Sequence, residues 1–277
     1  MSTTAIKFIF AHNMIELQGD FNRYFKQQLD TVEEFVIPFI EEVKPVTKGL
    51  RFLEVGSGYG GICKAFANAG CQVTGIELWN YASDISKDFL KEDIEAGRIE
   101  IINRNVYDIK IGEHVKDYYD IILLKDTIEH IHDQEKFMQH IIHFLKPDGV
   151  IFFAFPPWYM PFGGHQQSLD NKFLQKLPYY HLLPDFIYRG MMKMGGESEG
   201  RIRDTMEVKE TQISINRFEK ISKNAGFEIV KKEFYLINPS YKHKFGATPR
   251  KQFNLLSAIP ILRDFFTTTC YYILKKS

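Results

Sequence analysis

The stretch Leu53–Gly61 constrains this chain more than any other, because an acidic residue closes an apolar strand and a glycine-dense turn follows at once. Gly56, Gly58 and Gly60 alternate with other residues in that turn. Glycine adopts positive φ readily and has no side chain, so the turn can bend sharply and bring bare backbone N–H groups against a ligand. A helix that begins there directs its positive end at the same place. The stretch therefore predicts a strand–turn–helix unit that binds a nucleotide-like cofactor.

Two glycine registers fit this turn. Gly56, Gly58 and Gly61 satisfy the G-x-G-x-x-G spacing of dinucleotide-binding proteins, which keeps an NAD(P)-dependent oxidoreductase open as an alternative. Two acidic residues favour the other register, which consists of Gly56, Gly58 and Gly60. Glu54 stands two positions before the first glycine, where the dinucleotide fold keeps an apolar residue, and Glu77 ends the next apolar strand. A carboxylate accepts hydrogen bonds from both vicinal hydroxyls of a ribose, so this pair indicates a nucleoside ligand.

The segment Glu54–Gly60 resembles the first motif of the class I S-adenosylmethionine-dependent methyltransferases, acidic-x-Gly-x-Gly-x-Gly, at each defined position. The resemblance implies that Glu77 holds the cofactor ribose. It implies that Asn105, where the family commonly has aspartate, accepts from the adenine amino group, and that the D-x-x-E-H-I segment starting at Asp126 passes beside the methionine end. The residues so assigned to S-adenosylmethionine are Glu54, Gly56, Ser57, Gly58, Gly60, Glu77, Leu78, Asn105, Val106 and Asp126.

Helical and strand-like segments alternate along the chain without an internal repeat, which predicts an α/β fold with a mainly parallel sheet. The resemblance implies a Rossmann-like, doubly wound sheet of seven strands with an antiparallel C-terminal strand. We expect an N-terminal helical region over 21–43, which could form a lid over the cofactor, and a turn at 147–149. The other expected helices cover 59–69, 82–96, 134–145 and 217–225, and the expected strands cover 50–55, 71–76, 99–102, 119–124, 150–155, 227–236 and 267–274.

Residues 157–214 interrupt the alternating pattern with a segment rich in aromatic residues and methionine. So many large apolar side chains argue against disorder, so we expect a substrate cap inserted into a single domain of residues 1–277. Pro156, Trp158 and Phe162 are the predicted substrate-binding residues. A small satellite core is the alternative. The methionines favour an adaptable pocket for a small acceptor, quinone-like or lipid-like.

Methyl transfer requires alignment above all, because the sulfonium is already a good electrophile. A base is needed only for a protonated nucleophile, and His165 and His130 are the catalytic candidates, since imidazole accepts a proton near neutrality. His130 has the alternative role of orienting its loop, and His165 follows a diglycine that we expect to be flexible. His140 and His143 lie three apart without a third ligand, so no metal site is predicted.

The amino-acid composition limits the classes of binding partner that we expect for this chain. The chain has 35 basic and 35 acidic residues, which gives no bulk attraction to nucleic acid, so a small-molecule substrate is expected. Three cysteines without C-x-x-C spacing and the absence of a signal-like apolar run favour a cytoplasmic protein with no transmembrane segment. The basic residues within 241–251 either bind a phosphate or carboxylate of the substrate or form a solvated loop. A protein that binds the cofactor without catalysis is the third alternative.

Overall fold

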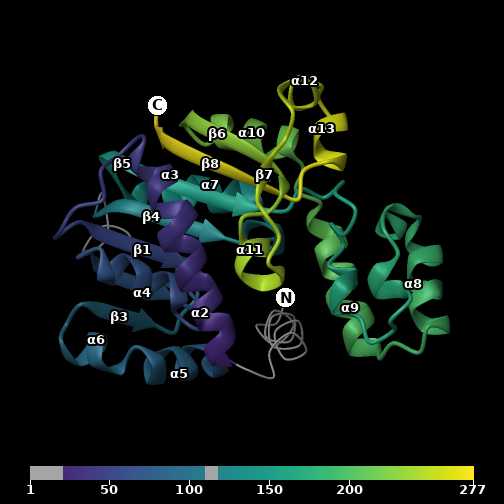
Figure 1. Cartoon of the computed structure of the whole chain (residues 1–277), viewed down its shortest axis with the longest axis horizontal. Coiled ribbons are helices and arrows are strands. Elements are labelled where there is room, and N and C mark those ends of the chain that lie inside the picture. Colours follow the sequence, from purple (N-terminus) through teal and green to yellow (C-terminus); the bar gives the residue numbers. More distant parts are fainter. Residues whose placement is uncertain (1–20, 110–117) are drawn as a thin grey trace.

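The computed structural model describes residues 21–109 and 118–277 (Figure 1). In these residues one sheet of eight strands has the order β3-β2-β1-β4-β5-β8-β6-β7. The first five strands pair in parallel, and β8 runs antiparallel between β5 and β6. The strands are β1 (Arg51–Val55), β2 (Gln72–Ile76), β3 (Ile99–Ile102), β4 (Tyr119–Lys125), β5 (Leu145–Phe155), β6 (Phe227–Ile237), β7 (Arg250–Lys251) and β8 (Thr269–Lys276).

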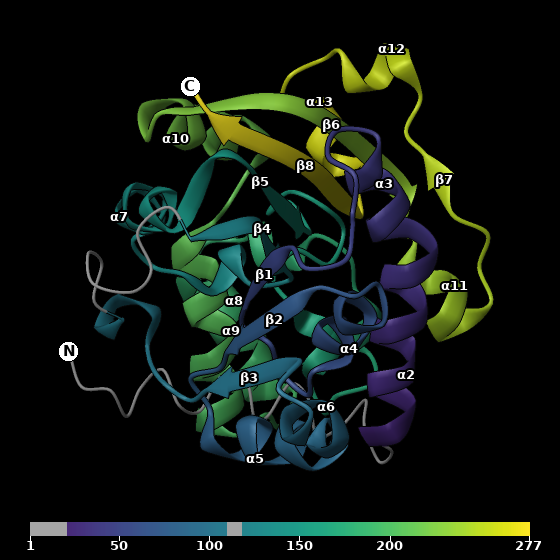
Figure 2. The same ribbon diagram turned by 90° about the vertical axis from the view of Figure 1, so that its left-hand side faces the viewer.

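Helices cover both faces of this sheet (Figure 2). One layer contains α2 (Phe21–Thr31), a π-helical turn (Val32–Val36), α3 (Ile37–Glu41), α4 (Gly61–Asn68), α5 (Asn80–Phe89) and α6 (Lys91–Glu95). The other contains α7 (Gln134–Ile141) and α10 (Ile215–Asn224).

Alternate residues of the strands supply the two cores. In β1, Phe52 packs in the core that includes α3 and α4, whereas Leu53 packs in the core that includes α7 and α10. Ile121 and Ile122 of β4 divide in the same way. Because both faces of these strands are buried, the strands read as continuous apolar runs in the sequence. The predicted doubly wound, mainly parallel α/β fold is confirmed.

The strand count and one strand boundary differ from the prediction. The sheet has eight strands instead of seven, because the two residues of β7 pair with β6. β5 begins at Leu145, which pairs with Tyr119, while Val150 pairs with Ile121. Residues 146–149 therefore bulge out of the strand, and the turn predicted at 147–149 lies within this bulge.

Two predicted helices are interrupted. The region 21–43 consists of α2, the π-helical turn and α3, and it ends before Pro45. The helix expected over 82–96 is divided into α5 and α6, which meet at the buried residue Leu90.

Residues 157–214 form a helical unit beside the sheet, with α8 (Asp185–Met194) and α9 (Glu199–Thr211) as its main helices (Figure 1). The unit has a separate apolar core, made of Leu169, Leu174, Tyr180, Tyr188, Met192, Ile202 and Met206. These seven side chains are therefore structural. Among the helices of the described ranges, none combines the length and the apolar character needed to cross a bilayer.

The strand order reverses between β1 and β4. At such a reversal the following segments leave toward opposite faces, and a crevice forms at the carboxyl ends of the strands. Gly56 follows β1, Glu77 follows β2, Asp126 follows β4 and Pro156 follows β5. The sheet thus brings four of the predicted site residues to one edge.

Candidate functional site

The turn after β1 has backbone angles that favour glycine. Gly56, Gly58 and Gly60 have φ angles of 81°, 52° and 86°. A Cβ on Gly56 would lie 2.8 Å from Oγ1 of Thr127, and one on Gly60 would lie 2.5 Å from Cδ1 of Leu90. A Cβ on Gly58 would meet nothing within 4 Å. A side chain at the first or the third glycine would therefore displace Thr127 or Leu90, whereas Gly58 borders open space.

Gly61, the last glycine of the alternative register, allows a helix–helix contact. A Cβ there would lie 2.5 Å from the backbone oxygen of Phe25 in α2. In a dinucleotide-binding unit the third glycine allows its own helix to approach the sheet closely. Here the close approach joins α4 to α2, which favours the register that contains Gly60.

The Glu77 carboxylate joins the end of β2 to the glycine turn. Its Oε2 accepts a hydrogen bond from the Gly58 N–H at 2.8 Å, and its Oε1 accepts one from the Trp79 N–H at 2.9 Å. Burial raises the pKa of this carboxyl group. Each carboxylate oxygen has a second lone pair, so Glu77 can also accept from a ligand hydroxyl.

Glu54 is buried near the turn and does not line the hollow beside it. Its Oε2 accepts a hydrogen bond from the Cys63 thiol at 3.0 Å. Burial raises the pKa of Glu54 to about 8, and the neighbouring charge of Glu77 also raises it. The group is therefore largely neutral at pH 7 without a ligand, and a cationic ligand group nearby would favour its ionised form.

A first hollow, of about 50 Å³, lies between the glycine turn, Glu77 and α2. Tyr24 and Gln28 of α2 form part of its wall. Tyr24 also packs edge-on against Tyr59 of the turn, with ring centroids 5.8 Å apart. Tyr24 and Gln28 therefore place α2 directly beside the glycine turn.

A second hollow, of about 280 Å³, lies on the other side of Asp126. The two hollows share Tyr24, Gln28, Lys125 and Asp126 in their walls. A ligand in the first hollow and a ligand in the second would therefore meet at Asp126. The predicted residues that line the second hollow are Asp126, His130, Pro156, Phe162 and His165.

Asp126 has the positive φ angle of 53°, which is uncommon outside glycine. Its N–H donates to the Ala154 carbonyl of β5 at 2.8 Å, and its carboxylate pairs with Lys125. Strained backbone of this kind is found preferentially at functional sites. This backbone conformation lies where the chain leaves β4.

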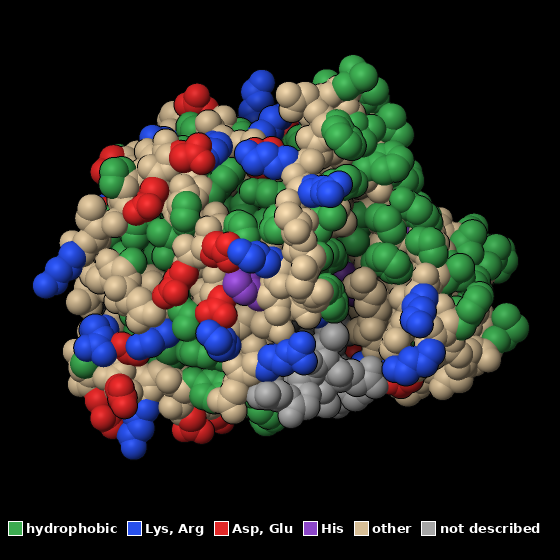
Figure 3. Space-filling model, viewed as in Figure 1, with side chains coloured by type: hydrophobic (Ala, Val, Ile, Leu, Met, Phe, Trp, Pro, Cys, Tyr) green, Lys and Arg blue, Asp and Glu red, His purple; other side chains and the backbone are tan. Residues whose placement is uncertain are grey.

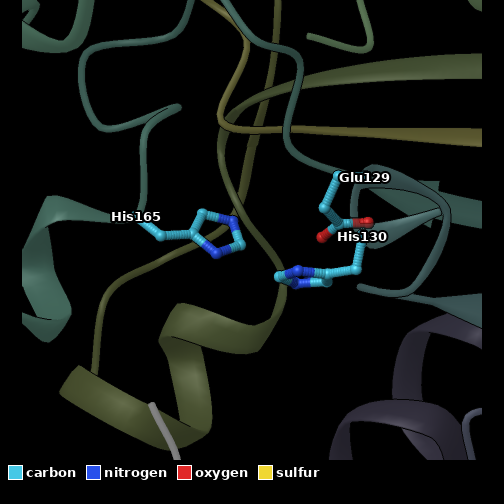
Figure 4. Close-up of side chains that lie close together, drawn as sticks. All are labelled: Glu129, His130 and His165. Atoms are coloured by element: carbon cyan, nitrogen blue, oxygen red, sulfur yellow. The ribbon is translucent and has the colours of Figure 1, made fainter. Parts of the chain in front are cut away.

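The two histidines predicted as catalytic lie side by side (Figure 4), with ring centroids 5.0 Å apart and an angle of 65° between the rings. His130 ends the 3₁₀ turn Ile128–His130, whereas His165 begins the 3₁₀ turn Gln166–Ser168 of the insert. Burial lowers the pKa of both imidazoles, and for His130 the neighbouring His165 lowers it further. Both rings are therefore neutral near pH 7.

The diglycine before His165 is tightly packed, contrary to the expected flexibility. A Cβ on Gly163 would lie 2.1 Å from the Trp158 carbonyl oxygen, and one on Gly164 would lie 2.4 Å from Cβ of His181. His165 itself has a φ angle of 55°. The contacts fix the path of the chain and therefore the place of the His165 ring.

Trp158, predicted to bind substrate, is buried within the insert and is not in the wall of the second hollow. Its N–H donates to the Ile213 carbonyl at 2.8 Å. Its ring packs edge-on against His181, whose Nε2 lies 2.9 Å from the Trp158 carbonyl oxygen. The geometry gives Trp158 a role in holding the insert together.

Several predicted cofactor residues lie at the same sheet edge without lining either hollow. The Asn105 Oδ1 accepts from the Tyr107 N–H at 3.0 Å, so this amide caps a 3₁₀ turn, in which Val106 is buried. Leu78 packs beside Tyr59. Ser57 is fully buried, and its Oγ has no hydrogen-bond partner among the described residues. Their roles toward a cofactor stay predictions.

The long connection between β6 and β8 supplies part of the wall, in keeping with one of the two interpretations of the basic residues within 241–251. Tyr241 and Lys244 of α11 (Ser240–Phe245) line the second hollow. Burial lowers the pKa of the Lys244 ammonium. The basic residues of 241–251 do not act together, because Lys242 and His243 pair with Glu34 instead.

Three comparisons with known proteins are informative. The model of the methyltransferase domain family matches residues 16–232. A ubiquinone biosynthesis O-methyltransferase of Paracidovorax citrulli is 27% identical over 144 residues, which are 52% of this chain and 57% of that protein. The chain thus spans about half the length of the curated relatives it matches.

Solved structures share the fold at low sequence identity. The phosphoethanolamine N-methyltransferase 2 of Haemonchus contortus, solved with S-adenosyl-L-methionine, gives a TM-score of 0.55 at 17% identity, over 99% of this chain and 56% of that one. A methyltransferase of Leishmania major gives a TM-score of 0.51 at 14% identity, over 98% and 82%.

Proposed function

Because the chain belongs to the methyltransferase domain family, we propose that it transfers the methyl group of S-adenosylmethionine to a small-molecule acceptor. The proposal rests on one observation: the two hollows are adjacent and share Asp126 in their walls. The first is bordered by the glycine turn and Glu77, and the second by apolar and basic side chains. Such an arrangement suits a reaction in which a group passes in line between two bound molecules.

In the first hollow, Glu77 and the backbone of Gly58 would hold the nucleoside, with Glu77 accepting from the ribose hydroxyls. Glu54 would ionise when the cationic end of the cofactor binds, because an opposite charge stabilises the carboxylate. Tyr24 and Gln28 of α2 would contact the cofactor from the side of α2. Asn105 and Val106 are proposed to approach the adenine, and Asp126 the methionine end.

In the second hollow, Pro156, Met160 and Phe162 provide apolar contact for a quinone-like or lipid-like acceptor. The curated relatives are named for ubiquinone biosynthesis, which supports an aromatic hydroxyl as the nucleophile. Lys244 would contact a carboxylate or a second oxygen of the acceptor. A hydroxyl must lose its proton, and the neutral rings of His165 and His130 line the place where it would lie.

Exposed hydrophobic side chains on the surface of the molecule also support a lipid-like acceptor. Hydrophobic side chains gather on the side of α8, α12 (Asn254–Ser257) and α13 (Leu262–Phe265) (Figure 3). The most exposed of them are Phe186, Met194, Phe253 and Leu255. An apolar tail of the acceptor would contact these side chains.

The three buried free thiols, Cys63, Cys71 and Cys270, support a reducing, cytoplasmic setting.

The test is incubation of the protein with methyl-labelled S-adenosylmethionine and two acceptor sources, a set of alkylated dihydroxybenzenes and a metabolite extract. The account predicts a labelled product heavier by one methyl, together with S-adenosylhomocysteine. Cofactor binding with no labelled product from any acceptor would favour the binding-only alternative. Preferential binding of a nicotinamide dinucleotide would favour the oxidoreductase.

A further inference from the structure

Glu129, His130 and His165 bring three potential metal-ligand atoms together at the second hollow (Figure 4). One carboxylate oxygen and one ring nitrogen from each histidine lie within 4.8 Å of one another. Two of these side chains are neighbours on the 3₁₀ turn after β4, and the third comes from the insert, 35 positions later in the chain. The cluster exists only because the insert returns to the sheet edge.

The Glu129 carboxyl group is buried without a hydrogen-bond partner among the described residues. The residue is 3% exposed, and neither carboxylate oxygen has a hydrogen-bond partner among the described residues. The nearby cation, Lys125, pairs with Asp126. A buried charge is costly unless it is paired or coordinates a metal. A bound cation would supply the missing partner.

Contacts outside the cluster fix the backbone positions of Glu129 and His165. Thr211 of α9 donates from its Oγ to the Glu129 carbonyl oxygen at 2.6 Å, which ties the turn to the insert. The packing of Gly163 and Gly164 fixes the His165 backbone. Ligands around a tetrahedral zinc ion lie roughly 3.3 Å apart at bond lengths of about 2.0–2.1 Å. The three ligand atoms, which lie within 4.8 Å of one another, would therefore move closer together on binding an ion.

We propose that Glu129, His130 and His165 bind one divalent first-row transition-metal ion whose open coordination positions face the second hollow. Two imidazoles and one carboxylate are a ligand set for Zn²⁺ or Fe²⁺, whereas Mg²⁺ and Ca²⁺ prefer oxygen ligands. Three protein ligands leave room for a further ligand, as in catalytic zinc sites.

The role of the ion rests on the proposed function. The ion coordinates the acceptor hydroxyl and lowers its pKa, so the O–H proton leaves to solvent and a metal-bound oxyanion forms. The oxyanion forms a bond to the methyl carbon while the carbon–sulfur bond breaks and its electron pair stays on sulfur. Anion and sulfonium become a neutral ether and a neutral thioether, and nothing is oxidised or reduced. His130 and His165 then act as ligands and not as bases.

The test is a titration of chelator-stripped protein with Zn²⁺ by calorimetry and with Co²⁺ by visible absorption. The expected result is one ion per chain, with an affinity at least tenfold lower in Glu129→Gln and in His165→Ala. His143→Ala changes an exposed histidine and should bind as the wild type does. Circular dichroism verifies that each variant is folded.

Binding that is absent, or that both ligand-site variants retain unchanged, overturns the metal site. The proposed function is assessed separately, by the affinity of stripped protein for S-adenosylmethionine and by its turnover before and after Zn²⁺ is restored. Normal cofactor binding and full turnover in stripped protein would contradict the metal's role and leave the methyl transfer standing. Metal binding in a protein that does not bind the cofactor would contradict the proposed function alone.

Discussion

The Gly58 N–H donates to the Glu77 carboxylate at 2.8 Å, so the glycine turn after β1 and the end of β2 are joined at the floor of the first hollow. The bond sets the position of an acidic group that lines the hollow and has further lone pairs with which to accept from a ligand. It also couples two sequence features that lie 19 positions apart.

Gly58→Val should abolish binding of S-adenosylmethionine while the protein still folds. The residue has a φ angle of 52°, and its Cβ would meet no protein atom, so the new side chain would occupy ligand space. The positive φ angle costs roughly 1–2 kcal/mol of stability. Gly49→Val is the matched control, because Gly49 has a φ angle of 87° with nothing within 4 Å and lies outside both hollows. Equal cofactor affinity in the two variants by calorimetry would refute the role of the turn.

Glu54 should make the stability of the ligand-free protein depend on pH. Its pKa is about 8 in the folded protein, against an ordinary value of 4.5. A raised folded-state pKa gives stability that is complete below the unfolded value and is lost as pH rises through the folded value. Relative to Glu54→Gln, the wild type should therefore lose up to about 1.4 kcal/mol per pH unit between pH 4.5 and pH 8. Urea unfolding across this window gives the difference, and parallel profiles of the two proteins would exclude the assignment.

Phe162→Ala should raise the KM for the acceptor several-fold with little change in cofactor affinity. Phe162 lines the second hollow and not the first, and a contact with a nonreacting part of the substrate positions the reacting atom. Phe173→Ala is the control, because Phe173 is 70% exposed on the insert and outside the hollow. Steady-state kinetics with the acceptor found by labelling provides the measurement. An equal effect of both substitutions would place the acceptor elsewhere.

The sheet and one edge of the site were predictable from the sequence because their signals are local. The buried strand β1, the positive-φ glycines and the acid after β2 each leave a pattern within a few residues. The rule that ligands bind at the carboxyl ends of parallel strands then brings Gly56, Glu77 and Asp126 together. Strand boundaries were less predictable, as the bulge at 146–149 shows.

The rest of the site depends on contacts between distant segments. Nothing in the sequence around His165 indicates that its ring lies 5.0 Å from that of His130, because the tight packing of Gly163 on Trp158 determines the path of the insert. For the basic residues within 241–251 the sequence left a substrate contact and a solvated loop open, and only the fold shows that Lys244 of α11 lines the hollow. The apolar residues of the insert suggested a pocket in the sequence, but Tyr180, Tyr188 and Met192 belong to a separate core of the insert.

The most direct test of the account is a calorimetric titration of S-adenosylmethionine into the wild type and Glu77→Ala, with a nicotinamide dinucleotide as the competing ligand. We predict that the wild type binds S-adenosylmethionine and not the dinucleotide, and that Glu77→Ala weakens the binding by roughly 1.5–3 kcal/mol, the scale of hydrogen bonds to a charged group. Glu100→Ala, at an exposed carboxylate of β3, should bind normally. Unchanged affinity in Glu77→Ala, or tighter binding of the dinucleotide by the wild type, would contradict the assignment of this sheet edge as the methyl-donor site.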